Sequence, residues 1–276
     1  MNDLMQILRI GEFEPILKAC VDQGEGLNDA LDGGAGWGAT ATEMLPYISG
    51  SVYAFEPFPG NHRFFENLDP RINLHKQALA AQNGTSLFHV RQSVSNQDSW
   101  GQKGLSGYSS VGKIVKQKRS EDDFHVDSVR GDDVIPSSAK VDFIKLDLQK
   151  GEYAAMLGME RLFSTCKLAW IEFMGDENIL KFLYNRNFVI FDTAYVFVGE
   201  VRTDLENDFD IVKKSSNSQD IPTNVAFRKA GWMNFHQKFL DERQSNTFVQ
   251  TDLLAVHPDF FPRFNRMIAK QSANGF

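Results

Sequence analysis

The sequence predicts an α/β fold built on a mostly parallel sheet, and three observations favour it. Residues 31–36 read Leu-Asp-Gly-Gly-Ala-Gly, which is typical of a buried strand followed by a glycine-rich turn into a helix. Runs rich in β-forming residues recur at 51–55, 72–79 and 141–148, and helical patterns separate them. The chain has 276 residues, of which 42% are apolar and 24% charged, so it can bury a globular core.

The glycine-rich turn predicts a nucleotide-like cofactor, because glycines let a ligand lie against bare backbone at a helix N-terminus. The spacing of Gly34, Gly36 and Ala39 also satisfies the dinucleotide fingerprint. Asp32 argues against a pyrophosphate, which it would repel, and favours S-adenosylmethionine, which carries cationic groups. A turn or helix-capping role is the structural alternative for Asp32. The cofactor-binding residues predicted here are Asp32, Gly33, Gly34, Ala35, Gly36 and Trp37.

Two further positions are candidates for the nucleoside. Glu56, followed by Pro57, ends the run at 51–55, and an acidic residue about 20 positions after the glycines suits the two ribose hydroxyls. A solvent-facing strand end is the alternative for Glu56. Gln77 and Ala78 are candidates for the adenine rim, on position alone, because ligands bind at the carboxyl ends of parallel strands.

The remaining elements follow from periodicity and from glycine and proline breaks. Asn61 is expected to cap its helix. The expected strands are residues 29–31, 52–55, 72–79, 85–90, 141–148, 167–173, 188–198 and 251–256, and the expected helices are 39–47, 61–67, 153–163 and 178–184, with two short helices within 3–21.

One large domain is expected over residues 28–258, preceded by a helical cap at 1–27 and followed by a C-terminal tail at 259–276. Two segments interrupt it, at 82–137 and 201–250. The polar stretch 93–110 within the first is expected to be a substrate-facing loop or lid, with a disordered surface as the alternative. The aromatic stripe formed by Trp232, Phe235, His236 and Phe239 is expected to be core or an oligomer contact, and a substrate wall is the alternative.

The composition limits which binding partners and which cellular compartment we expect. The net charge of −7 argues against a large nucleic-acid surface. No run approaches the about 18 apolar residues that a membrane span needs. The two cysteines suggest neither a disulfide framework nor a zinc site, which fits the cytoplasm, and a homo-oligomer could form.

Three blocks of the sequence resemble the FkbM family of S-adenosylmethionine-dependent methyltransferases: residues 31–36, 55–57 and, above all, 141–152. The third resembles the family's Lys-x-Asp strand signature, followed by a turn and a glutamate that opens a helix. The resemblance covers about residues 28–200 and 251–258. It implies a Rossmann-like class I methyltransferase fold, with a seven-stranded, mostly parallel sheet, helices on both faces and an antiparallel last strand. Trp37 and Lys150 depart from the family pattern.

The resemblance also implies O-methylation of a hydroxyl on a sugar, glycan or secondary metabolite. The catalytic candidates lie on the strands at 141–148 and 167–173 or just after them: Lys145, Asp147, Glu152 and Glu172. Asp147 or Glu152 would orient or deprotonate the acceptor, with Lys145 nearby and Glu172 across the cleft. Asp147 is also a candidate for the cofactor site, and helix capping is its structural alternative.

No resident metal is expected, since the six histidines lack ligand spacing. A magnesium ion between Asp147 and Glu172 is the alternative. Two other functions stay open. An NAD-dependent oxidoreductase would share the fold, although no tyrosine has a lysine four residues later. A protein that binds the cofactor without catalysis is the second.

Overall fold

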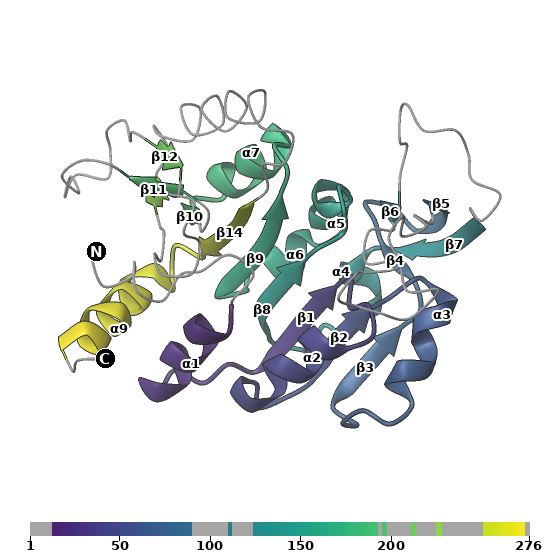
Figure 1. Cartoon of the computed structure of the whole chain (residues 1–276), viewed down its shortest axis with the longest axis horizontal. Helices are drawn as coiled ribbons and strands as arrows, with labels where there is room; N and C mark the ends of the chain where they lie inside the picture. The colour runs from purple at the N-terminus through teal and green to yellow at the C-terminus, as the bar shows by residue number, and fades with distance from the viewer. Residues whose placement is uncertain are drawn as a thin grey trace. The chain divides into compact units, whose positions relative to one another are not determined.

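The structure, a computed structural model, describes residues 13–89, 110–111, 124–192, 195–197, 211–213, 225–227 and 251–273. It contains two compact units, Asn28–Ser164 and a second unit that combines Met1–Leu27 with Thr165–Phe276. We call Asn28–Ser164 the glycine-loop unit, because it contains the glycine loop, residues 33–38. Figure 1 shows the elements of both units.

Four parallel strands run through the glycine-loop unit in the order β8-β1-β2-β3 (Figure 1). They are β1 (Asp29–Gly33), β2 (Val52–Phe55), β3 (Ile72–His75) and β8 (Val141–Leu146). β1 lies between β2 and β8 and is buried from Ala30 to Gly33, as expected of an inner parallel strand. The carboxyl ends of parallel strands meet at one edge of a sheet, so the glycine loop, Glu56 and Asp147 all follow strands that end there.

Each of three predicted helices in this unit is in fact a pair of short helices. They are α2 (Ala39–Met44) with η2 (Leu45–Tyr47), α3 (Pro59–His62) with η3 (Arg63–Phe65), and α5 (Glu152–Leu157) with α6 (Glu160–Phe163). Gly158 ends α5 where a Cβ would lie 2.0 Å from the Ala80 carbonyl oxygen. The predicted cap at Asn61 is wrong, because α3 begins earlier and its N-cap position is Phe58.

A second, four-stranded sheet of order β4-β7-β5-β6 belongs to the same unit. Its strands are β4 (Ala78–Leu79), β5 (Gly84–His89), β6 (Ser110–Val111) and β7 (Phe124–Val129), and α4 (Gly131–Val134) follows β7. The predicted strand at 72–79 is therefore two strands, β3 and β4, which belong to different sheets. The insertion at 82–137, predicted as a loop with one strand, contributes three strands to this sheet. Of its predicted substrate-facing part, 93–110, only Ser110 is described, as the first residue of β6.

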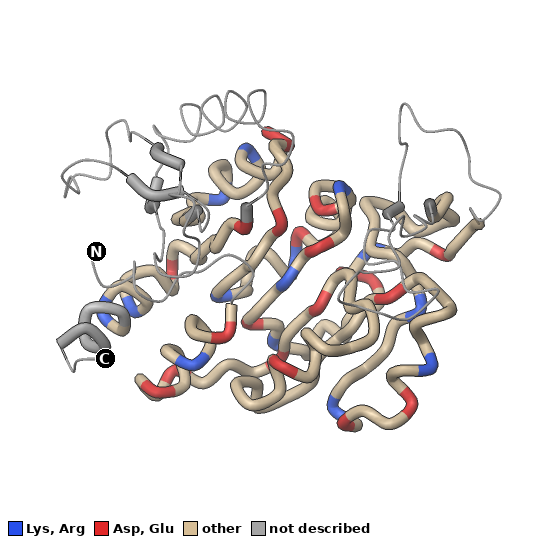
Figure 2. The backbone as a smooth tube through the Cα atoms, viewed as in Figure 1, with Lys and Arg blue, Asp and Glu red and all other residues tan. Residues whose placement is uncertain are grey.

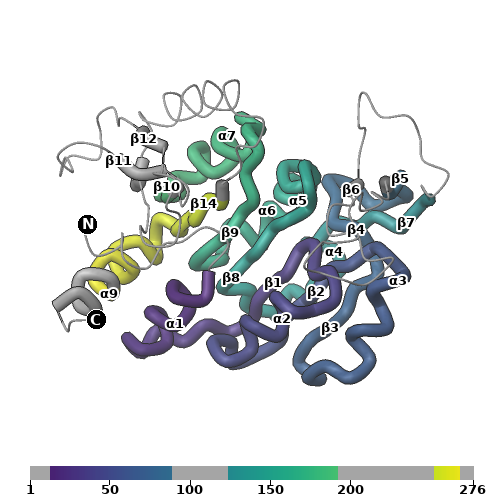
Figure 3. Tube along the Cα trace, viewed as in Figure 1, coloured from purple at the N-terminus to yellow at the C-terminus, as the bar shows by residue number. Residues whose placement is uncertain are grey.

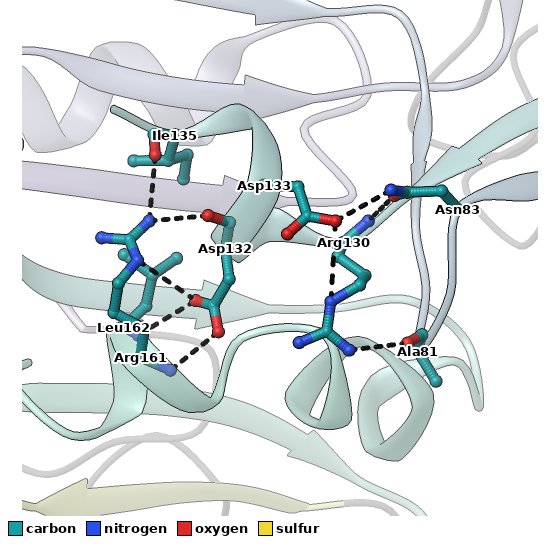
Figure 4. Close-up of polar contacts among 8 residues, drawn as sticks. All are labelled: Ala81, Asn83, Arg130, Asp132, Asp133, Ile135, Arg161 and Leu162. Atoms are coloured by element: carbon teal, nitrogen blue, oxygen red, sulfur yellow. Dashed lines mark hydrogen bonds and ion pairs between the residues drawn. The ribbon is translucent and has the colours of Figure 1, made fainter. Parts of the chain in front are cut away.

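Side chains around α4 tie the end of β7 to α6 (Figure 4). The carboxylate of Asp132 accepts the backbone N–H groups of Arg161 and Leu162, at 2.7 and 3.1 Å. It thereby satisfies the first N–H groups of α6, which have no partner within their own helix. The guanidinium of Arg130 donates to the carbonyl of Ala81 at 3.1 Å, which joins β7 to the turn that precedes β5.

The second unit contains antiparallel strands in the order β13-β10-β14-β9. They are β9 (Leu168–Phe173), β10 (Val189–Asp192), β13 (Val225–Phe227) and β14 (Thr251–Val256), and β11 (Tyr195–Phe197) pairs separately with β12 (Ile211–Lys213). The helices are α1 (Glu14–Asp22), α7 (Glu177–Asn185) and α9 (Phe261–Ala273). Although α1 and α9 come from opposite ends of the chain, they contact each other within this unit (Figure 3).

Several sequence expectations for the second unit need correction. The predicted strand at 188–198 is two strands, β10 and β11, in different sheets. The predicted tail at 259–276 contains a long helix, α9. Of the insertion at 201–250 only β12 and β13 are described, so the aromatic stripe at 232–239 lies outside the described residues, as do residues 1–12 of the predicted cap.

The predicted fold class, an α/β fold with a mostly parallel sheet and helices, is confirmed, and the last strand, β14, is antiparallel to its neighbours β9 and β10 as expected. Red acidic and blue basic positions are interspersed within each unit (Figure 2). Within the described ranges, no helix combines the length and the apolar character that crossing a membrane requires.

Asp29 joins three strands of the parallel sheet at their amino ends. Its two carboxylate oxygens accept the backbone N–H groups of Ser51 and Lys140, both at 2.8 Å. We expect Asp29→Ala to lower the unfolding free energy by about 2 to 3 kcal/mol, because two N–H groups lose a charged acceptor. Urea unfolding measures this cost. Asp127→Ala, on the exposed face of β7, is the control, and equal stabilities of the two variants would contradict the role.

Candidate active site

Three backbone N–H groups of the glycine loop donate hydrogen bonds to other groups of the protein. The N–H groups of Gly34 and Ala35 donate to the Phe55 carbonyl at 3.1 and 3.0 Å. The N–H of Gly36 donates to Oε2 of Glu56 at 2.8 Å. A pyrophosphate at a helix N-terminus is bound by such N–H groups. In this loop those three donors already have partners, and one of these partners is a carboxylate.

Two glycines of the loop have different structural roles. Gly34 has φ +82°, and a Cβ there would lie 2.0 Å from the carbonyl oxygen of Asp147. Its lack of a side chain therefore allows the glycine loop to approach the loop that follows β8. Gly36 has φ +55°, and a Cβ there would meet nothing within 4 Å. Gly36 thus borders open space, where a ligand could lie against the backbone.

Glu56 is buried directly beside this open position. Its Oε2 accepts from Gly36, as described, and its Oε1 accepts the N–H of Phe58 at 2.8 Å. Burial raises the pKa of the Glu56 carboxyl to about 7. The hydrogen bonds from these N–H groups and from the Asn61 side chain act in the opposite direction and lower the pKa. Each carboxylate oxygen can accept a second hydrogen bond, so Glu56 retains acceptor capacity for ligand hydroxyls.

Asn61 is a candidate site residue whose role the sequence does not predict. Its side chain is 5% exposed, and its Oδ1 accepts no hydrogen bond from any residue that the structure describes. An orphaned buried oxygen is costly, so it marks a place where a bound group could supply a donor. A lone asparagine in a helical segment carries no sequence signal for this role.

Asp32 and Asp147 share one lysine at the carboxyl edge of the sheet. Asp32 is fully buried, and neither of its carboxylate oxygens accepts a hydrogen bond within the described part of the chain. Nζ of Lys145 lies 3.6 Å from Oδ1 of Asp32 and 3.6 Å from Oδ2 of Asp147. Burial raises the pKa of Asp32, and the Lys145 charge opposes this shift. The Asp147 side chain is 43% exposed, so it is accessible to an acceptor.

Glu152 closes the loop between β8 and α5. Its Oε1 accepts the N–H groups of Leu148 and Lys150, at 2.7 and 3.3 Å. Gln149 and Lys150 both have left-handed backbones, with φ +53° and +86°, which costs free energy in residues with side chains. Nε2 of Gln149 donates to Oδ1 of Asp147 at 3.0 Å. Glu152 therefore holds a strained loop that also fixes the orientation of Asp147.

The other predicted residues are placed as follows. Glu172 is buried in β9 of the second unit, opposite Asp252 of β14. Ala78 is buried in the core of the small sheet with Phe88 and Val126, while Gln77 is half-buried in the connection before it. Trp37 is half-buried in the glycine loop and Pro57 is buried after Glu56. Among the described residues, no group of three or more His, Cys, Asp or Glu side chains could hold a metal ion.

The model of the methyltransferase FkbM domain matches residues 32–190, which is more than half of the chain. The chain belongs to the FkbM methyltransferase family. The matched range contains the glycine loop, Glu56 and the β8 signature, so the family resemblance of these motifs is confirmed. The Rossmann-like class I methyltransferase fold that it implied is confirmed with it.

Two solved methyltransferase structures are similar to this chain. Methyltransferase FkbM from Methylobacillus flagellatus is 16% identical with a TM-score of 0.34, and the match covers 53% of this chain and 32% of that one. An S-adenosylmethionine-dependent methyltransferase from Clostridium acetobutylicum is 12% identical with a TM-score of 0.32, over 87% and 88% of the two chains. The match thus spans about a third of the Methylobacillus protein. No curated protein matches the chain.

The stability of the protein without ligand is expected to fall as the pH rises through neutrality. Burial raises the pKa values of Glu56 and Glu152 from 4.5 to about 7, so the folded state holds these protons more tightly than the unfolded state. The resulting stability is fully present below pH 4.5 and is lost as the pH passes the folded pKa of about 7. Each carboxyl can contribute up to about 3 kcal/mol.

Chemical unfolding at pH 5.5 and at pH 8 gives two free energies of unfolding, and their difference measures this pH dependence. Glu152→Gln should remove about half of it, since the amide does not titrate. Equal pH dependence in wild type and variant would show that Glu152 is not the source.

Proposed function

We propose that this FkbM methyltransferase transfers a methyl group from S-adenosylmethionine to a hydroxyl group of a sugar, glycan or other small metabolite. The observation that carries the cofactor assignment is the chemistry of the glycine loop. Its N–H groups at Gly34, Ala35 and Gly36 have protein acceptors, and the carboxylates of Asp32 and Glu56 flank it. This environment is suited to a cationic nucleoside and unsuited to a pyrophosphate.

The residues present fit S-adenosylmethionine. Glu56 would accept the ribose hydroxyls through its remaining lone pairs, and the open space at Gly36 would take part of the cofactor. The charge of Asp32, which has no hydrogen-bond donor among the described residues, would favour the cationic end. Trp37, Pro57 and Gln77 would complete the site, whereas Ala78 would support it from the core of the small sheet.

S-adenosylmethionine supplies an electrophilic methyl group when it is bound. The task of the protein is then to hold the acceptor oxygen in line and to remove its proton. We assign this task to Asp147, whose half-exposed carboxylate is oriented by Gln149 and Lys145. We assign Glu152 a positioning role, because its Oε1 binds backbone N–H groups of the Asp147 loop. A role for Glu172 stays a prediction.

The alternative functions are less well supported. An NAD-dependent oxidoreductase needs loop N–H groups free for a pyrophosphate, and at Gly34, Ala35 and Gly36 these groups already have partners. A non-catalytic cofactor-binding protein would need no oriented carboxylate beside the loop, yet Asp147 is held by two side chains. The two cysteines are free and buried, which supports a proposed cytoplasmic location.

Asp147→Asn is expected to lower turnover about 100-fold to 10,000-fold, because the amide cannot accept the acceptor's proton. Its affinity for S-adenosylhomocysteine is expected to stay close to that of wild type. Calorimetry with S-adenosylhomocysteine measures this affinity first. The activity assay then follows transfer of a labelled methyl group from S-adenosylmethionine to a panel of monosaccharides and glycans. Asp127→Asn, at an exposed position of β7, is the control. Full turnover by Asp147→Asn would contradict the assignment.

A further inference from the structure

The ammonium group of Lys145 lies close to two carboxylates at the carboxyl edge of the sheet, one buried and one partly exposed. Lys145 and Asp32 are paired in register on the neighbouring strands β8 and β1. Their side chains form an ion pair at 3.6 Å, and the same Nζ lies 3.6 Å from Asp147. At this distance the contact is electrostatic rather than a hydrogen bond. The Asp32 side chain is 0% exposed and that of Lys145 is 12% exposed, so water screens the pair weakly.

A carboxylate buried in this way keeps its charge only if a counter-ion compensates for the lost hydration. The charged groups that act on Asp32 are Lys145 on β8, Asp147 directly after β8, Glu43 on α2 and Glu56 after β2. Among these four groups Lys145 alone is positive. Burial and the acidic neighbours raise the pKa of Asp32, and Lys145 lowers it.

We propose that Lys145 is a positioning residue that keeps the buried Asp32 carboxylate charged, and that this charge makes the site prefer a cationic cofactor over its neutral product. The inference rests on the proposed cofactor. S-adenosylmethionine is a net cation, whereas S-adenosylhomocysteine has lost the sulfonium charge and is net neutral. Asp32 acts through its field, since its oxygens are inaccessible to a direct contact. The Asp32 charge, which Lys145 maintains, thus favours binding of the methyl donor over retention of the spent product.

The proposal makes an unusual prediction for Lys145→Met. A simple sum of charges predicts that removing a cation strengthens the preference for S-adenosylmethionine. If Lys145 keeps Asp32 ionised, the variant instead takes up a proton on Asp32 at neutral pH, so the net charge of the two positions stays at zero and the preference stays close to that of wild type. Raising the pH should remove that proton, leave Asp32 negative without its lysine and strengthen the preference.

The experiment measures the ratio of the two dissociation constants, product over donor, by calorimetry between pH 6.5 and 8.5. At each pH the variant's ratio is divided by that of wild type, which cancels the titration of the ligands and of Glu56. At pH 6.5 Asp32→Asn should lower the preference at least fivefold, whereas Lys145→Met should stay within about twofold of wild type. Toward pH 8.5 the preference should rise above that of wild type in Lys145→Met and stay low in Asp32→Asn, while Lys145→Arg should behave as wild type.

A stronger preference in Lys145→Met that is already present at pH 6.5, or a preference that does not rise toward pH 8.5, would overturn the proposal. Thermal unfolding without ligand tests the ion pair separately. Lys145→Met should lower the melting temperature, and the double variant Asp32→Asn/Lys145→Met should recover part of the loss, because no lone charge stays buried. If wild type binds neither compound, the proposed function fails, while the double-variant cycle still tests the pair.

Discussion

Gly34→Ala is expected to lower the free energy of unfolding by about 4 kcal/mol or more, the largest effect among the substitutions considered. An alanine Cβ would lie 2.0 Å from the backbone carbonyl oxygen of Asp147, so two backbone segments would have to separate. The left-handed φ of +82° adds about 1 to 2 kcal/mol for any residue with a side chain. Urea unfolding followed by circular dichroism measures the loss.

Gly36→Ala is the matched control in the same loop. Its Cβ would meet no atom within 4 Å, so only the smaller cost of a left-handed alanine applies and the protein should fold. The methyl group would enter the open space proposed for the cofactor, and affinity for S-adenosylhomocysteine should fall at least about tenfold. Equal stability losses in Gly34→Ala and Gly36→Ala would show that the contact with Asp147 is not limiting.

Glu56→Gln is expected to weaken S-adenosylhomocysteine binding about 100-fold, which corresponds to about 2.7 kcal/mol. Two effects combine. The amide loses the charge that strengthens hydrogen bonds from the ribose hydroxyls. Its NH2 group would also face the N–H of either Gly36 or Phe58, which now donate to the two carboxylate oxygens at 2.8 Å. Isothermal titration calorimetry at pH 8, where Glu56 is mainly ionised, measures the change.

Glu66→Gln is the control for Glu56→Gln, because Glu66 is an exposed residue of the same segment. It makes the same chemical change away from the glycine loop and should bind as wild type does. If Glu56→Gln bound the product within a factor of about three of wild type, Glu56 could not be the ribose acceptor.

The sequence predicts strands well where neighbouring strands bury a continuous apolar run. The runs at 52–55 and 251–256 have the bounds of β2 and β14. β1 ends two residues later than expected, because Asp32 and Gly33 continue the pairing with both neighbouring strands. A buried aspartate and a glycine resemble a turn in the sequence, and only the register shows that they belong to the strand.

Long-range contacts explain the elements that the sequence did not predict. The helix predicted at 153–163 breaks at Gly158, whose close neighbour is Ala80, a residue far away in the chain. The small sheet depends on pairing of β5 with β7 across a long intervening segment. Local periodicity contains no information on either contact.

The position of the candidate site could be predicted, but not its internal connections. The carboxyl ends of β1, β2 and β8 explain why Asp32, Glu56 and Asp147 follow or end strands at one edge. The N–H groups that Glu152 accepts depend on the left-handed backbone of Gln149 and Lys150, which their residue types do not favour. The sequence suggested that either Asp147 or Glu152 orients or deprotonates the acceptor, and the contacts of Glu152 favour a positioning role for it.

The central claim is that the glycine loop binds a cationic nucleoside cofactor, and calorimetric titration of wild type with S-adenosylhomocysteine and with NAD tests it most directly. We expect micromolar binding of S-adenosylhomocysteine and no heat of binding with NAD. Binding of NAD without binding of S-adenosylhomocysteine would contradict the account, because a pyrophosphate would then be accommodated beside Asp32 and Glu56.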